Sequence, residues 1–200
     1  MEHTYKGYTI DIIHDDCPSN PREDWDNFGT MVCWHSRHNL GDSHDYERPE
    51  DFTIDMADKD HIILPLYLYD HSGITMSTSS FSCKWDSGQV GYIYVSKEKI
   101  KKEGLEDKTV EEIELYLTSE VKTYDNYLQG FVYGYQVINP DGDEKNSCWG
   151  FFGDDHENSG LLEYAKNAID CELASARKTK HAKIKTWIRN RVPLQYRLEV

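Results

Sequence analysis

The stretch TVEEIELYLTSEVKTYDNYLQG, residues 109–130, decides most about the fold. Thr109 and Glu112 have the spacing of a capping box, in which each side chain accepts the other residue's backbone N–H. Apolar side chains then recur every three or four residues, which is typical of a helix packed on a core. They are Val110, Ile113, Leu117, Val121, Tyr124 and Leu128. Gly130 follows as a C-terminal cap. The stretch therefore predicts an amphipathic helix.

Most of the predicted strands come before this helix. They are short apolar runs, rich in β-branched and aromatic side chains and separated by turn sequences. Their ranges are residues 5–13, 30–35, 62–69, 74–83, 89–95, 131–138 and 147–152. Groups of antiparallel strands with helices inserted late indicate an α+β fold. We expect a single domain over residues 1–200, with a mostly antiparallel sheet and two or three helices on one side.

The C-terminal part predicts further helix. Asn158 or Ser159 can cap a helix, and residues 181–191 either extend it or form a third one, with residues 194–200 as an edge strand. Residues 171–200 carry 8 Lys and Arg against 2 Asp and Glu, so this is a basic helical segment. Alone it is typical of a nucleic-acid-binding helix. Beside an acidic body, we expect it to pack on the protein's own acids or on another subunit, which leaves a homodimer open.

The rest of the chain is strongly acidic. Residues 1–170 carry 14 Lys and Arg against 34 Asp and Glu, and the whole chain has a net charge of −14. Such a field repels nucleic acid and membranes and attracts basic protein surfaces. We therefore expect a partner with a basic surface, and neither direct nucleic-acid binding nor a membrane. Scattered cysteines without a CxxC motif and the lack of a signal-peptide pattern predict a cytoplasmic protein.

Acidic side chains are interleaved with aromatic ones in two loops. This mixture suits a protein interface, because aromatic side chains anchor a partner and charge steers it. An ordinary solvated acidic surface is the simpler alternative. The candidate partner-binding residues are Glu23, Asp24, Trp25, Asp26, Asp42, Asp45 and Tyr46.

A metal site is one alternative. Cys33, His35, His38 and His44 are zinc-ligand types within twelve residues, but their spacing matches no standard zinc module. A core cysteine with loop histidines is the simpler interpretation. We assign no metal and no cofactor here and keep a metal site near Cys33 and His35 as an alternative.

A small pocket is the other alternative. Asp70, His71, Ser72 and Gly73 include the residue types of a hydrolase, but adjacent residues rarely form a catalytic triad. The same four residues suit a hairpin turn. We assign no catalytic residue. The alternative that we keep is a pocket near His71 and Ser72 that binds or hydrolyses a small ligand or a nucleotide.

Three phrases carry a resemblance. DWDNFGTM at residues 24–31, LPLY at 64–67 and WDSGQVG at 85–91 resemble a group of small proteins encoded by phages and other mobile elements. The similarity covers most of residues 20–153, and the group has no activity whose residues could be transferred. It implies an inhibitor of host defence in the host cytoplasm, similar to anti-CRISPR or antirestriction proteins. The expected function is a non-enzymatic inhibitor that binds the basic nucleic-acid-binding surface of a host defence nuclease.

Overall fold

The computed structural model describes residues 1–57 and 60–191, so the strand expected at residues 194–200 lies outside the described residues. In this part of the chain there are two four-stranded antiparallel sheets and five helices. The α+β class is confirmed, with one more sheet and more helices than expected. None of the described helices is long and apolar enough to span a membrane.

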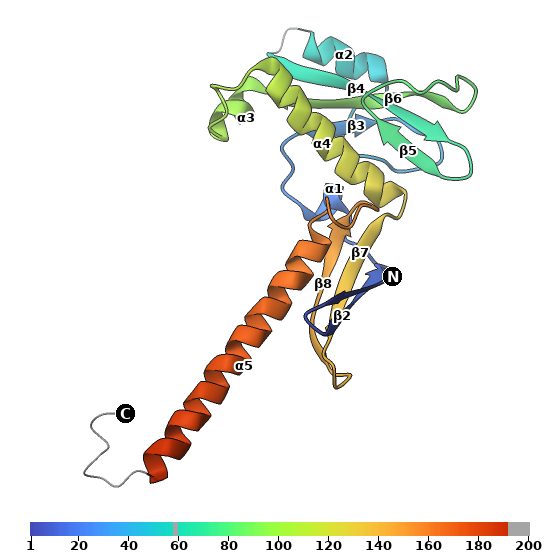
Figure 1. The fold of residues 1–200 in the computed structure, drawn as a ribbon. Helices are drawn as coiled ribbons and strands as arrows, with labels where there is room; N and C mark the ends of the chain where they lie inside the picture. The colour runs from blue at the N-terminus through green and yellow to red at the C-terminus, as the bar shows by residue number, and fades with distance from the viewer. Residues whose placement is uncertain (58–59, 192–200) are drawn as a thin grey trace. The chain divides into compact units, whose positions relative to one another are not determined.

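The chain forms two compact units (Figure 1). The central unit is Asp16–Val132, and the terminal unit combines Met1–Asp15 with Tyr133–Val200.

The central unit is built on a sheet with the strand order β3-β6-β4-β5. Its strands are β3 (Thr30–Cys33), β4 (His61–Asp70), β5 (Ile74–Ser77) and β6 (Ser87–Ser96). Three of its helices are α1 (Pro21–Asp24), α2 (Pro49–Met56) and α3 (Lys97–Lys102). The fourth, α4 (Val110–Leu128), confirms the helix expected from the opening stretch: the Thr109 hydroxyl accepts from Glu112 N at 3.2 Å, and the Glu112 carboxylate accepts from Thr109 N at 2.9 Å.

Helices cover both faces of this sheet. Side chains alternate along a strand, so Ile93 of β6 faces one way and Tyr94 the other. Ile93 packs in the cluster that α4 completes with Leu117. Tyr94 packs in a second cluster, which Phe52 of α2 completes. The helices were expected on one side only, and the apolar side chains on both faces of β6 explain the difference.

The terminal unit has the strand order β1-β2-β7-β8 and one helix. Its elements are β1 (Glu2–Tyr5), β2 (Tyr8–His14), β7 (Val132–Ile138), β8 (Glu144–Phe152) and α5 (Leu161–Arg191). Residues 5–13 were expected as one strand, but the chain reverses at Lys6 (φ 50°) and Gly7 (φ 84°). Two positive φ values in succession fit a tight two-residue hairpin turn.

A single long helix completes the terminal unit. Leu161, Ala165 and Ile169 of α5 are fully buried against Ile10 and Val137 of the sheet. The helix then continues to Arg191, so residues 181–191 extend it rather than form a separate element.

Candidate functional site

A buried arginine organises the part of the central unit where the interface was expected. The Asn20 side chain accepts from Arg22 N at 3.0 Å, and Pro21 occupies the first turn, so this sequence starts the short helix α1. The helix directs the Arg22 side chain inward, where only 1% of it is exposed. Sequence analysis did not single out this residue.

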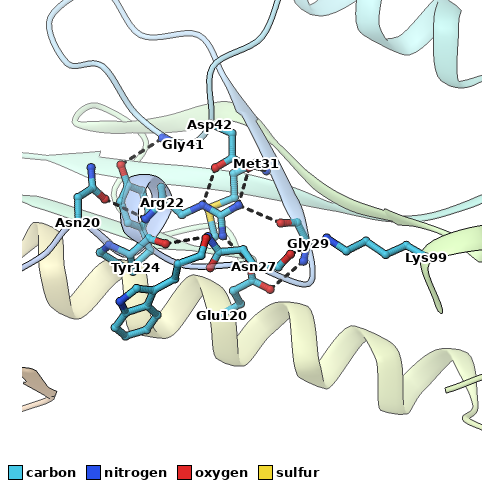
Figure 2. Close-up of polar contacts among 12 residues, drawn as sticks. Asn20, Arg22, Asn27, Gly29, Met31, Gly41, Asp42, Lys99, Glu120 and Tyr124 are labelled. Atoms are coloured by element: carbon cyan, nitrogen blue, oxygen red, sulfur yellow. Dashed lines mark hydrogen bonds and ion pairs between the residues drawn. The ribbon is translucent and has the colours of Figure 1, made fainter. Parts of the chain in front are cut away.

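Arg22 is bound by two carboxylates (Figure 2). Its Nε and Nη2 donate to the two oxygens of Asp42 at 2.8 and 2.5 Å, and Nη1 donates to Glu120 of α4. The carboxylates in turn accept backbone N–H groups: Met31 N donates to Asp42 at 2.9 Å, and Gly29 N donates to Glu120 at 2.8 Å. Burial opposes the charge on Arg22, but the bonds to Asp42 and Glu120 outweigh it and raise the pKa of Arg22. Asp42 therefore holds the fold and does not present a free carboxylate.

The other residues expected near α1 are exposed. Glu23, Asp24, Trp25 and Asp26 directly follow Arg22 and lie at the surface. Because Arg22 fixes α1 against α4, these side chains belong to the α4 side of the sheet.

Tyr46 lies elsewhere in the unit. Its ring is half-buried against Phe52 of α2, and its hydroxyl donates to Asp55 at 2.7 Å. That hydrogen bond raises the pKa of Tyr46 to about 12. Asp45 beside it is exposed. The seven candidate residues therefore divide between the α4 side and the α2 side, which sequence reasoning did not anticipate.

The region around α2 carries an acidic surface with an apolar side chain in it. We call it the α2 surface, and it consists of Asp45, Glu47, Glu50, Asp51, Ile54 and Asp55. Arg48 is the one basic residue between positions 45 and 55, and its bonds to Asp51 hold the pKa of that carboxyl below its usual value. Ile54 is 73% exposed, although it lies in a helix that buries Phe52 and Met56. The sequence did contain a signal for this surface. In a helix, residues two apart point in nearly opposite directions, so Ile54 faces away from the buried Phe52.

Some of the residues that can bind zinc do lie close together, but they are not the set that the sequence suggested. Cys33, His35, His38 and His44 all line a cavity of about 630 Å³. Burial raises the pKa of the Cys33 thiol to about 12, so in the metal-free protein it stays protonated. Among residues 1–57 and 60–191, the group whose ligand atoms lie within 4.8 Å of one another is instead His35, His38 and Asp70.

The hydrogen bonds of this group fit an ion-pair cluster better than a metal centre. His35 Nδ1 accepts from the backbone N–H groups of Arg37 and His38, at 3.4 and 3.2 Å. Neutral His35 then carries its proton on Nε2, which lies 3.6 Å from Asp70. A metal-bound histidine has the reverse arrangement, with its second nitrogen donating. Arg37 also donates to Asp70, so a cation already balances that carboxylate.

The segment around Ser72 forms the turn between β4 and β5. Ser72 has a positive φ of 59°, and His71 N donates to Gly73 O at 3.1 Å. The His71 ring lies 3.5 Å from Asp86 rather than on the Ser72 hydroxyl. The hairpin interpretation therefore accounts for these residues, and the geometry does not activate Ser72 as a nucleophile.

Comparison with protein-family models, with curated proteins and with solved structures finds no match for this chain. What can be inferred about function therefore comes from the residues of this chain and from the three phrases at residues 24–31, 64–67 and 85–91.

Proposed function

We propose that this chain is a non-enzymatic binding protein whose α2 surface contacts a basic protein surface. The observation that carries the proposal is the exposure of Ile54 among carboxylates, on a unit with 23 Asp and Glu against 11 Lys and Arg. Carboxylates speed the encounter with a basic partner, while an exposed apolar side chain supplies contact area once the partner has arrived.

The chemistry of the other candidate sites favours binding over catalysis. Cys33 is held as a thiol, Ser72 lies in a turn without a bonded base, and His35 is tied to the backbone through Nδ1. Each arrangement lacks the activated nucleophile or base that catalysis requires.

The finer proposal names the partner as a host defence nuclease. Nucleases hold phosphates with rows of Lys and Arg, and exposed carboxylates can occupy the same rows. The resemblance to small phage and mobile-element proteins supports this class of target. Binding should then exclude the nucleic acid from the nuclease.

The test is affinity capture from a bacterial lysate digested with nuclease, so that nucleic acid does not bridge proteins. The variant Asp45→Asn with Glu47→Gln and Glu50→Gln removes three exposed charges of the α2 surface. A matched control removes three exposed charges elsewhere, and consists of Glu103→Gln, Glu106→Gln and Asp107→Asn.

Capture of a basic nuclease at 50 mM salt, which added DNA displaces, would support the proposal. The α2-surface variant should lose this capture, and the control variant should keep it. Equal loss in the control variant, or capture insensitive both to salt and to DNA, would overturn the proposal.

A further inference from the structure

The second half of α5 packs on no other described element of the terminal unit. Leu173 is the last side chain of this helix in the core of the terminal unit. All side chains from 174 to 191 are exposed except Ile188, which is partly so. We call residues 174–191 the distal helix. Eighteen residues at 1.5 Å each make it about 27 Å long, and Figure 1 shows it extending beyond the strands of its own unit.

The distal helix is uniformly basic. It contains no Asp or Glu. Its basic residues are Arg177, Lys178, Lys180, Lys183, Lys185, Arg189 and Arg191. An uncovered helix of this charge repels a second copy of itself, which argues against pairing of two distal helices.

The basic side chains frame a neutral stripe. Small or polar residues recur at steps of four, three, four and four, which places them on one face of the helix. They are Ser175, Thr179, Ala182, Thr186 and Asn190. Lys178, Lys185 and Arg189 lie along one side of this stripe, and Lys180, Lys183 and Arg191 lie along the other. The helix thus presents a narrow uncharged face between two rows of cations.

Duplex DNA has the matching shape and charge. Its major groove is about 12 Å wide and accepts one α-helix, with phosphates on both walls and base edges on the floor. Hydroxyl, amide and methyl groups are the side-chain types that contact base edges there. The major groove of A-form RNA is too narrow for such a helix.

The acidic body does not prevent this contact. At physiological salt the Debye length is about 8 Å, and the tip of the distal helix lies about 27 Å along the helix axis from Leu173. The charge of the terminal unit's body is therefore screened at the tip. The expectation that nucleic acid is not a partner rested on the charge of the acidic body, residues 1–170, whereas the charge that would meet DNA is that of the distal helix.

Apolar side chains on the distal helix do not indicate a membrane. Ile184 and Trp187 are exposed, and the Arg191 guanidinium lies 4.0 Å from the centre of the Trp187 ring. Lys180 and Arg191 interrupt the apolar strip, so no broad apolar face forms. Membrane-surface helices need such a face.

We propose that the distal helix binds duplex DNA in the major groove, with its two basic rows on the phosphates and the neutral stripe toward the base edges. This goes beyond the proposed function and does not depend on it.

The first test measures binding of the full chain to a fluorescein-labelled 30-base-pair DNA of mixed sequence, by anisotropy between 50 and 200 mM salt. The six cations of the two basic rows predict a slope of log affinity against log salt of about −5. The variant Lys178→Gln, Lys185→Gln, Arg189→Gln should lower the slope to about −3 and weaken binding roughly 100-fold at 100 mM salt. Glutamine keeps the helix propensity, and circular dichroism confirms the helix.

The matched control is Lys84→Gln, Lys101→Gln, Lys102→Gln, which removes three exposed charges of the central unit. It should change affinity less than about twofold, because these groups do not reach the phosphates. An equal loss in this control would overturn the proposal. Equal affinity for an RNA duplex of the same sequence, or for polyaspartate, would also overturn it, as would binding to phosphatidylserine vesicles but not to DNA.

The second test addresses orientation. Ala182 lies on the neutral stripe and His181, its neighbour in sequence, lies about 100° around the helix. Both are exposed. At pH 8, Ala182→Glu should weaken DNA binding at least about tenfold more than His181→Glu, since only the former places a carboxylate in the groove. Equal effects of the two substitutions would overturn the assigned orientation.

Discussion

Replacing Arg22 by methionine should destabilise the central unit strongly. The substitution keeps a long apolar stem but removes the cation that Asp42 and Glu120 share. It leaves these two carboxylates facing each other, with only 22% and 15% of their side chains exposed. Removing one partner of a buried ion pair costs about 3–5 kcal/mol. Because both carboxylates keep some contact with water, we expect the lower end, about 3 kcal/mol.

The charge explanation can be separated from simple loss of packing. In the variant Arg22→Met, Asp42→Asn, Glu120→Gln, the amide oxygens still accept from Met31 N and Gly29 N, but no unbalanced charge remains. This triple variant should recover about 1–2 kcal/mol relative to Arg22→Met alone, since the penalty for an uncompensated buried charge is gone.

The assay should report on the central unit alone, because a chain with two units need not unfold in one step. Native-state hydrogen exchange of the Ile93 amide, in the central strand β6, gives the free energy of opening. A loss below about 1 kcal/mol in Arg22→Met would refute the assigned role. A triple variant less stable than Arg22→Met would refute the charge explanation.

Two further predictions concern the histidines. The free energy of unfolding should fall as the pH drops from 7.5 to 5.5: burial lowers the pKa of His35 and His156, so the unfolded chain binds protons more readily. Native-state hydrogen exchange in each unit over this pH range checks it, and an unchanged pH dependence in His35→Gln with His156→Gln would contradict it. Zinc should not bind stoichiometrically in isothermal titration calorimetry, because His35 Nδ1 faces N–H donors. Equimolar binding that His38→Ala abolishes would disprove this.

The parts of the fold that were predicted correctly depend on patterns between residues that are close in the sequence. The helix α4 follows from the spacing of its apolar side chains and from the Thr109 and Glu112 cap, all within one segment. The sequence prediction placed helices on one side of the sheet only, although the pattern for a second covered face was present, since Tyr92 and Tyr94 alternate with Ile93 and Val95 in β6. Apolar residues on both faces indicate a strand covered on both sides.

The missed features depend on contacts between distant residues. In the sequence, Asp42 could not be told apart from other loop carboxylates, because its partner Arg22 is 20 residues away. The other carboxylate that binds Arg22, Glu120, is 98 residues from Arg22. Asn20 and Pro21 did carry a helix-start signal, which would have placed Arg22 in α1 but not its side chain in the core. The reversal at Lys6 was hidden because a lysine with positive φ is uncommon.

The pairing of β2 with β7 has a consequence for synthesis of the chain. His14 is opposite Tyr133, and the 118 residues between them form one continuous stretch that contains the central unit. At about 5–20 residues per second, the ribosome needs roughly 6–24 s to cover that interval. During this time the first hairpin has no neighbour for β2, whereas the central unit emerges whole and can fold. The hairpin of β1 and β2 is therefore synthesised before the central unit but completes its sheet after it, and an unpaired β2 edge is exposed to chaperones and to aggregation until β7 arrives.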